Sequence, residues 1–352
     1  MPPRFSTQLL KWYEQYGRHD LPWQINPTPY RVWISEIMLQ QTQVTTVIPY
    51  FQRFMQRFPT IQSLATAPED DVLAHWSGLG YYARARNIHK TAQIIHTDYR
   101  SRFPKTVDAL MMMPGIGRST AGAIIGFSQK IKAVILDGNV KRVLSRYFAL
   151  KEPVNKTQVI QQLWSVADQL TPEKNAHQYN QAIMDLGATL CTRTKPRCTE
   201  CPVKTQCLAF QENQPTLYPI KTVKKARPTK TVRLLIIQNA QQEILLLKRP
   251  SRGIWGGLWS FPEQAVTAMY HCFYCDDKML SLRYIDELEK ITHTFTHFTL
   301  EIFPLLAKAT QKTVKQLIPD PQKFIWHNLS QPLPGGIAAP VARILEKLKG
   351  VL

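Results

Sequence analysis

Long hydrophobic runs are absent from this sequence of 352 residues. No stretch approaches about 18 consecutive apolar residues, the length at which a transmembrane helix becomes a candidate. The opening residues, MPPRFSTQLLKWYEQYGR, contain neither an uninterrupted apolar core nor a small-residue cleavage site. Internal repeats and low-complexity tracts are also missing. We therefore expect a cytoplasmic protein without a membrane partner, and we take a monomer as the default state.

Cysteine is too sparse for a disulfide-stabilised secreted scaffold, with six in the whole chain, and four of the six lie between residues 191 and 207. Their spacing is Cys191-x6-Cys198-x2-Cys201-x5-Cys207. Thiolates are soft ligands that suit zinc or an iron–sulfur centre. Structural zinc commonly uses two Cys-x2-Cys pairs, whereas here one tight pair is flanked by single cysteines. The spacing therefore favours an iron–sulfur centre over zinc.

Acidic residues are few relative to basic ones. The 25 Asp and Glu residues stand against 44 Lys and Arg residues, which gives a formal net charge of +19. Such an excess suits a polyanionic partner, so nucleic acid is the expected ligand. The chain is also long enough for two ordinary domains, each able to bury its own core without disulfides.

Two regions with different patterns follow one another along the chain. Apolar residues recur at three and four positions as far as about residue 210, which predicts a mainly helical domain over residues 1–212. The apolar rhythm is lost over residues 213–229, where basic residues replace acidic ones, so this segment is the expected linker. Short alternating runs followed by a final helix predict an α+β domain over residues 230–352.

Residues 107–128, VDALMMMPGIGRSTAGAIIGFS, have the pattern of an apolar helix, a tight turn and a second helix. Gly115 and Gly117 permit backbone conformations that other residues resist, so the amides of the turn can approach a phosphate closely. Arg118 adds positive charge next to them. Such contacts position DNA without reading its sequence. The alternative is an ordinary glycine-containing turn, because Gly-x-Gly alone is a weak signal.

Two carboxylates are candidates for catalysis. Asp137 follows an apolar, strand-like run at residues 133–136 and precedes a helix that we expect Asn139 to cap. Glu36 lies among apolar residues in WISEIMLQQ. Each has an ordinary alternative, a turn residue for Asp137 and a solvated helical glutamate for Glu36. Together they fit removal of a base, which needs an acid for the leaving group and a negative charge beside the developing sugar cation.

These motifs together resemble a known family. The hairpin MPGIGRSTAGAI, the following LDGNVKRV and the cysteine spacing are similar to the helix-hairpin-helix DNA glycosylase superfamily that contains endonuclease III. Within it, LPWQ, SEIMLQQTQV and GLGYYARARN resemble the MutY-type adenine DNA glycosylases. WGGLWSFPE and HTFTHF resemble that family's Nudix-like domain for recognising 8-oxoguanine. The resemblance covers the whole chain. It implies a helical glycosylase domain with a 4Fe-4S cluster in the loop 191–207, followed by an α+β Nudix-like domain.

The resemblance also implies roles for matching residues of the first domain. Glu36 would protonate adenine at N7, with a pKa raised by burial. Asp137 would stay ionised and stabilise the sugar cation or form a transient adduct with it, while Asn139 would help to order the site. The positions that line the pocket for the flipped adenine are Trp23, Gln24, Leu39 and Gln181. The positions that wedge into the base stack are Gln41 and Tyr81.

One position separates two kinds of enzyme in this superfamily. Members that also cleave the strand carry a nucleophilic lysine directly after the hairpin arginine, and this chain has Ser119 there. A serine cannot form the Schiff base, so we expect hydrolysis without strong strand cleavage. Lys141 could support slow chemistry at the abasic product, although an electrostatic contact with DNA is the simpler role.

In the second domain the resemblance points to Phe295, Thr296 and His297, which match a Phe-Ser-His loop that contacts 8-oxoguanine. Thr296 departs from that pattern but keeps the hydroxyl. The alternative is a half-exposed strand, which alternates in the same way. His271 and Cys272 stand where a Nudix box needs Arg-Glu, so we do not expect pyrophosphatase activity.

The function implied by the resemblance is base excision repair of adenine opposite 8-oxoguanine or guanine in duplex DNA, by hydrolysis of the N-glycosidic bond. Two alternatives stand beside it. One is an endonuclease III-like glycosylase with lyase activity, which Ser119 argues against. The other is a non-catalytic DNA-binding iron–sulfur protein whose carboxylates are structural.

Overall fold

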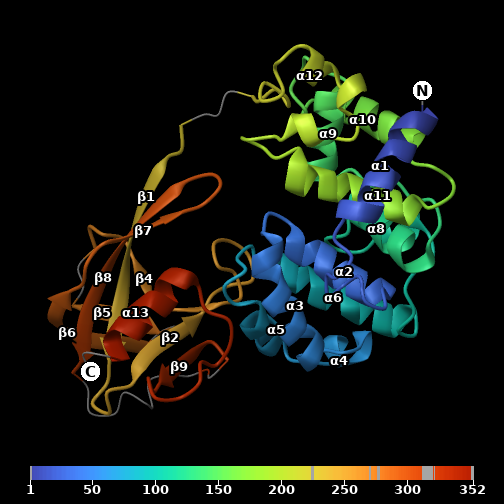
Figure 1. The fold of residues 1–352 in the computed structure, drawn as a ribbon. Coiled ribbons are helices and arrows are strands. Elements are labelled where there is room, and N and C mark those ends of the chain that lie inside the picture. Colours follow the sequence, from blue (N-terminus) through green and yellow to red (C-terminus); the bar gives the residue numbers. More distant parts are fainter. Residues whose placement is uncertain are drawn as a thin grey trace. The chain divides into compact units, whose positions relative to one another are not determined.

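The computed structural model describes residues 2–222, 226–268, 271–275, 278–310, 320 and 322–349. The chain forms two compact units, of which the first comprises Met1–Thr66 with Asn87–Lys224 and the second Ala67–Arg86 with Lys225–Leu352. The first is helical and the second is built around a sheet (Figure 1). The expected fold class, a mainly α region followed by an α+β region, is therefore confirmed. Residues 223–225 of the expected linker lie outside the described residues.

Helices dominate the chain up to residue 211, as the helical spacing of apolar residues predicts. Several begin at threonines whose side chains accept a backbone N–H, such as Thr28, Thr60 and Thr106. Among the described residues no helix is both long and apolar enough to span a membrane. In chain order the elements are α1 (Pro2–Tyr16), α2 (Pro29–Leu39), α3 (Val44–Arg57), α4 (Ile61–Ala65), α5 (Glu69–Trp76, in the second unit), α6 (Ala83–Asp98), α7 (Val107–Met111), α8 (Arg118–Gln129), α9 (Gly138–Tyr147), α10 (Thr157–Leu170), α11 (Ala176–Asp185), the π-helical η1 (Leu186–Leu190), the 3₁₀ turns η2 (Cys198–Glu200) and η3 (Lys204–Gln206), and α12 (Leu208–Gln211).

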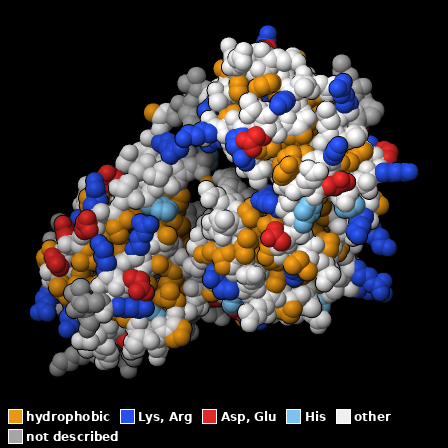
Figure 2. All heavy atoms as spheres, viewed as in Figure 1, with side chains coloured by type: hydrophobic (Ala, Val, Ile, Leu, Met, Phe, Trp, Pro, Cys, Tyr) orange, Lys and Arg blue, Asp and Glu red, His pale blue; other side chains and the backbone are white. Residues whose placement is uncertain are grey.

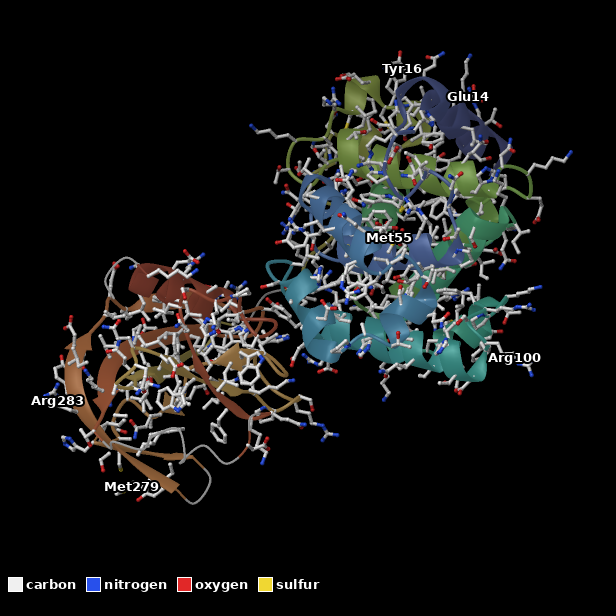
Figure 3. The ribbon with its side chains drawn as sticks, turned by 90° about the horizontal axis from the view of Figure 1, so that it is seen from below. Glu14, Tyr16, Met55, Arg100, Met279 and Arg283 are labelled. Atoms are coloured by element: carbon white, nitrogen blue, oxygen red, sulfur yellow. The ribbon has the colours of Figure 1, made fainter. Side chains whose placement is uncertain are left out.

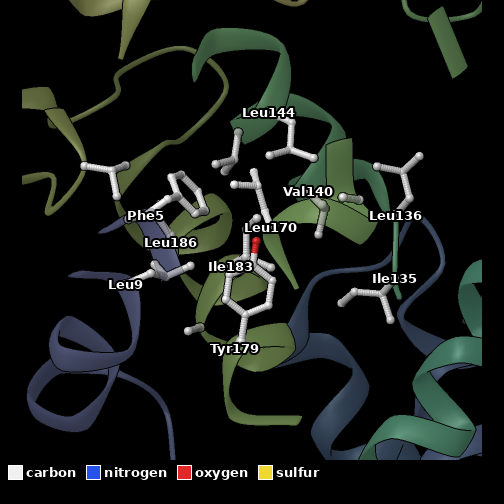
Figure 4. Close-up of a cluster of buried hydrophobic side chains, with 14 of the residues drawn as sticks. Phe5, Leu9, Ile135, Leu136, Val140, Leu144, Leu170, Tyr179, Ile183 and Leu186 are labelled. Carbon is white, nitrogen blue, oxygen red and sulfur yellow. The ribbon is translucent and has the colours of Figure 1, made fainter. Parts of the chain in front are cut away.

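A cluster of buried apolar side chains joins α1, α9, α11 and η1 in the first unit (Figure 4). Phe5, Leu144 and Leu186 in this cluster are fully inaccessible to solvent. The ring of Phe5 also meets the ring of Tyr147 edge-on, with 4.7 Å between centroids. The cluster fixes α9 against α11, the two helices that carry much of the site described below.

The expected helix-hairpin-helix is confirmed as α7, a tight turn and α8. Gly115 in the turn has φ +79°, and a Cβ there would lie 2.9 Å from the Cβ of Asn87, so a side chain has no room. The hydroxyl of Thr91 donates to the carbonyl of Pro114 at 2.9 Å and ties the turn to α6. The exposed backbone of the turn is therefore held in one conformation.

The strand-like run at residues 133–136 is not a strand in the structure. Its apolar side chains are buried, as a strand's would be, but its backbone bonds go to side chains of neighbouring helices. Asn180 donates to the carbonyl of Ala133 at 2.7 Å, and the amide of Leu136 donates to the hydroxyl of Ser119 at 2.9 Å. A buried apolar run predicts burial reliably, but it does not reveal which groups satisfy the backbone.

A mixed sheet forms the second unit, with strand order β3–β2–β1–β8–β6–β5, and β4, β7 and β9 pair with β1, β8 and β2 respectively. Strands β1 and β8 run parallel, with Thr229 opposite Thr299. The elements are β1 (Thr229–Gln238), β2 (Ile244–Lys248), β3 (Trp259–Ser260), β4 (Glu263–Gln264), β5 (Cys272–Cys275), β6 (Lys278–Glu287), β7 (Ile291–Thr294), β8 (Thr299–Ala309), β9 (Phe324–His327) and α13 (Ala339–Lys349).

Side chains alternate along β6 with the period of two that strands impose. On β6, Leu280 and Leu282 are buried in a cluster that also contains Leu235 of β1. Met279 and Arg283 lie on exposed positions of the same strand (Figure 3). Strand β6 therefore has one face that packs and one face that meets solvent, whereas residues 234–237 of β1 are buried on both faces of the sheet.

Residues 67–86 pack as an integral part of the second unit, although they precede most of the first unit in the sequence. The Nζ of Lys248 lies 2.8 Å from Oδ2 of Asp70, and the hydroxyl of Tyr82 donates to the carbonyl of Ile337 at 2.8 Å. A Cβ on Gly336 would approach the Cβ of Leu73 to 2.8 Å. Both polar and close apolar contacts thus bind this segment to the sheet-containing unit.

Candidate active site

A cavity of about 1290 Å³ lies in the first unit. Its walls come from the segment before α2, from α2, from the start of α8, from α9 and from α11. The cavity brings together most of the residues that the sequence assigned to catalysis and base binding. These are Trp23, Gln24, Glu36, Leu39, Gln41, Ser119, Asp137, Asn139 and Gln181.

Glu36 lies on α2 between buried neighbours and forms part of the cavity wall. Burial, with a contribution from the charge of Asp137, raises the pKa of Glu36 to about 8. Among the described residues its carboxyl group has no hydrogen-bond or ion-pair partner. Glu36 therefore holds a proton at neutral pH and can offer it to a group inside the cavity.

Asp137 is itself the N-cap of α9, so the expectation that Asn139 caps this helix is wrong. The amide of Val140 donates to Oδ1 of Asp137 at 2.8 Å, and Nδ2 of Asn139 donates to Oδ2 at 2.9 Å. The helix begins two residues earlier than expected, because the side chain of Asp137 accepts the amide of Val140 and so caps the first turn. Burial raises the pKa of Asp137, and these donors and the nearby Arg142 oppose that rise without cancelling it.

Arg142 connects this site to the segment that carries the cysteines. One of its terminal nitrogens donates to Oδ1 of Asn139 at 2.9 Å and to the carbonyl of Gly187 at 2.7 Å, while Nε donates to the carbonyl of Cys191 at 2.8 Å. Asn139 is thus held on one side by Arg142 and donates to Asp137 on the other. The orientation of the catalytic candidate depends on a continuous chain of hydrogen bonds.

The residues assigned to an adenine pocket lie on the walls of the same cavity. Trp23 is almost fully buried, and the ring of Phe51 meets it edge-on at 5.5 Å between centroids. The side-chain oxygen of Gln24 accepts a hydrogen bond from the backbone amide of Leu21 at 3.2 Å, which stabilises the turn at residues 21–24. Leu39 and Gln181 complete this group. The pocket combines a rigid aromatic wall with a few polar groups, as small-molecule sites commonly do.

Residues of the hairpin are exposed around the start of α8. Gly115, Gly117 and Arg118 all lie on the surface, and the guanidinium of Arg118 stacks 4.1 Å from the ring centroid of Trp164. Lys141 is not among the residues that line the cavity. On the face of the first unit that Figure 2 shows, Lys and Arg side chains are more widespread than Asp and Glu.

Gln41 and Tyr81 share an unusual backbone conformation, with φ values of +59° and +49°. Residues with side chains rarely adopt this left-handed region, and such strain concentrates at functional positions. Gln41 lies on the rim of the cavity in the first unit, whereas Tyr81 belongs to the second unit. Within the second unit the hydroxyl of Tyr81 lies 3.3 Å from that of Thr296.

The segment 295–298 forms a tight turn between β7 and β8, closed by a hydrogen bond of 2.9 Å from the amide of Phe295 to the carbonyl of Phe298. The two phenylalanine rings stack at 4.6 Å. This leaves Thr296 and His297 exposed at the tip of the turn. The strand interpretation holds for β7 up to Thr294, and the turn begins directly after it.

The four clustered cysteines, Cys191, Cys198, Cys201 and Cys207, line one cavity with an apolar wall. Arg146 is almost fully buried beside them and donates to the sulfur of Cys191 at 3.2 Å. Among the described residues no three His, Cys, Asp or Glu side chains meet closely enough to hold a single metal ion. The four thiols line one shared space.

These buried sulfurs lose their protons only beside a positive partner. Burial raises the pKa of Cys201 to about 12, and burial also raises the pKa of Cys198 and Cys207. Backbone N–H groups nevertheless point at the sulfurs of Cys201 and Cys207. Such donors suit thiolates, and thiolates at this depth form when a metal centre displaces their protons. The donor set fits an iron–sulfur centre.

Sequence patterns missed three residues that hold the site together: Arg142, Arg146 and Gly187. The two arginines are spaced four apart on α9, so they lie on the same face of the helix, which is the face toward Cys191. The spacing of four could therefore have indicated that both arginines contact the same neighbour. Gly187 carried none, because its importance comes from a contact with a residue 48 positions earlier, at Asn139.

A substitution at Gly187 tests whether this contact sets the position of Asn139. A Cβ there would lie 2.6 Å from the Cβ of Asn139, so Gly187→Ala should lower the free energy of unfolding by about 1–3 kcal/mol in urea denaturation. Gly138→Ala is the matched control, because a Cβ at Gly138 meets nothing within 4 Å. The control should change stability by less than about 0.5 kcal/mol. Equal effects of the two variants would contradict the steric argument.

Two family models match this chain. The HhH-GPD superfamily of base excision DNA repair proteins matches residues 34–169, and the NUDIX domain matches residues 233–347. Among curated relatives, the adenine DNA glycosylase of Buchnera aphidicola subsp. Acyrthosiphon pisum (strain APS) is 42% identical over 98% of this chain and 97% of its own length. The adenine DNA glycosylase of Homo sapiens is 33% identical over 84% of this chain and 65% of its own length.

Solved structures agree with these matches. A thermostable thymine-DNA glycosylase is 26% identical, with a TM-score of 0.55 over 59% of this chain and 95% of its own. An endonuclease III in a non-covalent DNA complex has a TM-score of 0.51 at 20% identity over 59% of this chain and 94% of its own, which shows a shared fold alone. The family expected from the sequence is thus confirmed: the chain belongs to the adenine DNA glycosylases, within the HhH-GPD superfamily of base excision DNA repair proteins.

Proposed function

We propose that this chain is a monofunctional adenine DNA glycosylase that hydrolyses the bond between adenine and deoxyribose in duplex DNA. The observation that carries the proposal is the pair of carboxyl groups, Glu36 and Asp137, on the walls of one cavity. Asp137 accepts two hydrogen bonds at the start of α9, whereas the pKa of Glu36 is raised to about 8. Removal of a base needs this division between a proton donor and an anion.

In the proposed reaction Glu36 gives its proton to N7 of adenine. The bond between N9 and C1′ then breaks, with its electron pair going to the base, and the carboxylate of Asp137 stabilises the sugar cation that develops. Water adds its oxygen to C1′, and the proton it releases returns to the carboxylate of Glu36. Asn139 takes part by holding the carboxylate of Asp137 in position.

The flipped adenine would occupy the pocket formed by Trp23, Gln24, Leu39 and Gln181. An almost fully buried tryptophan beside polar amides supports this role, because an extruded base needs both a stacking surface and hydrogen bonds to its edge. Gln41 would fill the space that the base leaves in the duplex. Its strained backbone on the cavity rim supports that assignment.

The hairpin would hold the phosphate backbone. The N-cap of α8 is Gly117, which has no side chain to satisfy the first amides of the helix, so those amides remain available to a phosphate. Gly115 would allow close approach of the turn, and Arg118 and Lys141 would supply positive charge. These contacts would position the duplex without reading its sequence.

The base opposite adenine would be 8-oxoguanine or guanine, read from the second unit. Thr296 and His297 carry polar groups on the exposed tip of the turn, while Phe295 packs against neighbouring rings and supports that tip. Tyr81 would enter the base stack beside them, since its hydroxyl lies next to that of Thr296.

We also propose that Cys191, Cys198, Cys201 and Cys207 hold a 4Fe-4S cluster. Four thiols that line one space, with a single Cys-x2-Cys pair flanked by lone cysteines, suit an iron–sulfur cluster better than a zinc ion. When bound, the cluster would supply a rigid crosslink for the loop 191–207. The chemistry at adenine would be carried by the carboxyl groups.

For the chain as a whole, we propose catalysis by residues 1–212, a linker at residues 213–229 and recognition of the opposite base by residues 230–352. Residues 67–86 pack in the second unit and would take part in that recognition through Tyr81. The protein would act on duplex DNA as a monomer in the cytoplasm. An endonuclease III-like lyase is the second candidate, and Ser119 on the wall of the cavity counts against it because it cannot form a Schiff base.

The first test is single-turnover release of adenine from duplexes that differ only in the opposite base. We expect release opposite 8-oxoguanine and guanine and little release opposite thymine. Thr296→Val should reduce the rate opposite 8-oxoguanine by about tenfold, the effect of one lost hydrogen bond, relative to the rate opposite guanine. Thr294→Val, in the preceding strand, is the matched control and should leave the ratio unchanged. A wild type that binds these duplexes and releases no adenine would refute the proposed function.

A pH profile tests the role of Glu36. The protonated form decreases as pH rises through about 8, so the wild-type rate should fall about tenfold per pH unit above that value. Glu36→Gln should lower the rate by about 10²- to 10⁴-fold and should abolish this dependence. Glu14→Gln changes an exposed glutamate on α1 and serves as the control (Figure 3). An unchanged rate at pH 9.5 would exclude Glu36 as the acid.

Borohydride trapping tests the absence of lyase chemistry. The wild type should give almost no covalent adduct with DNA, whereas Ser119→Lys places an amine on the wall of the cavity and should produce trapping and strand cleavage. Gln129→Lys adds the same charge at the exposed end of α8 and should not. If the wild type traps as efficiently as Ser119→Lys, the lyase candidate is correct instead.

A further inference from the structure

Asp185, the last residue of α11, is fully buried beneath the wall of the active-site cavity. Its Oδ2 accepts the backbone amide of Arg18 at 2.8 Å, and its Oδ1 accepts Nε of the same arginine at 2.9 Å. The two side chains form an ion pair. Oδ1 also accepts Nε2 of Gln181 at 2.9 Å, one helical turn earlier on α11. The cavity wall is therefore backed by a carboxylate held in place by an arginine.

This arrangement determines which end of the Gln181 amide enters the cavity. A carboxylate can only accept hydrogen bonds, so the amide nitrogen must face Asp185. The reverse orientation would place the amide oxygen of Gln181 against a buried negative charge. Since Gln181 lines the cavity, its Oε1 is the group left to meet a ligand there. The pocket thus presents a fixed hydrogen-bond acceptor.

A fixed acceptor discriminates between purines at position 6. Adenine carries an amino group there, which donates, whereas guanine and hypoxanthine carry an oxygen, which can only accept. A site built to accept a hydrogen bond rejects an analogue with an acceptor at the same place, because both groups then remain unpaired.

We propose that Asp185 is a positioning residue that sets the base specificity of the pocket by directing Oε1 of Gln181 toward the 6-amino group of the flipped purine. The inference rests on the proposed function and adds how the pocket would select adenine over other purines. Arg18 contributes by pairing with Asp185, because an unpaired carboxylate at this depth would be costly. Nothing in the chemistry at C1′ requires Asp185, so its effect should depend on the base and not on the bond that breaks.

The test compares three substrates, each paired with 8-oxoguanine in the same duplex: adenine, hypoxanthine, and purine without a 6-substituent. The variant Asp185→Asn can donate to Oε1 of Gln181, which lets the amide turn its nitrogen toward the cavity. The ratio of adenine to hypoxanthine release should then fall by about tenfold or more. Release of unsubstituted purine should change much less than release of adenine. Equal loss for all three bases would mean that Asp185 is only structural, and the proposal would be wrong.

A second variant keeps the test decisive if Asp185→Asn does not fold. Gln181→Met removes the amide at similar size and leaves the pair of Asp185 and Arg18 intact, and it should lose the same preference for adenine over hypoxanthine. Thr189→Val is the matched control, because the Thr189 hydroxyl donates only to the backbone carbonyl of Asp185, at 2.8 Å. It should keep the wild-type ratio.

The two proposals fail in different ways. Full preference for adenine in Gln181→Met would overturn the specificity device while leaving the glycosylase assignment in place. A wild type that releases none of the three bases would instead refute the glycosylase assignment itself. Bound iron and duplex affinity should match the wild type in each variant, which would show that the loop 191–207 and the DNA surface are intact.

Discussion

Two carboxyl groups that face one cavity cannot both carry a charge at low cost, and the organisation of the first unit follows from this constraint. Glu36 sits on a helix among apolar neighbours, and its pKa is raised to about 8. Asp137 sits at the start of a helix, where amide donors favour the ionised form and oppose the effect of burial. In the proposed reaction Glu36 is the acid and Asp137 is the anion, and the donors around Asp137 are the groups that favour its ionised form.

A carboxylate at Asp137 can stabilise a sugar cation only if α9 begins at a fixed place. Several parts of the chain hold the start of this helix. Its apolar face packs into the buried cluster around Phe5 and Leu186, while Arg142 ties its first turn to the backbone of Cys191. Gly187 also lies so close to Asn139 that Asn139 has no room to move toward it. An iron–sulfur cluster at the cysteines would thus act on catalysis by holding backbone. The path from the cysteines to the carboxylate of Asp137 consists of hydrogen bonds and packing.

Much of this was predictable where the signal is local. The shared site of the four cysteines, the helix-hairpin-helix and the two fold classes follow from short patterns, and they appear in the structure as expected. The start of α9 was misjudged by two residues because both Asp137 and Asn139 are good capping residues, and only packing selects between them. Asp185 gave no signal, since its importance depends on Arg18, which is 167 positions away.

The division into units is the other feature that no local pattern reveals, and it bears on how the proposed enzyme would read a mispair. Tyr81 comes from the first third of the sequence, yet it belongs to the same compact unit as Thr296. Asp70 and Tyr82 on either side of it are bound to Lys248 and to the backbone of Ile337. The residue proposed to enter the base stack and the turn proposed to read the opposite base therefore share one rigid support. A duplex that contacts Tyr81 meets the turn that carries Thr296 at a fixed spacing. Insertion of Tyr81 into the base stack and contact with the opposite base would therefore form together.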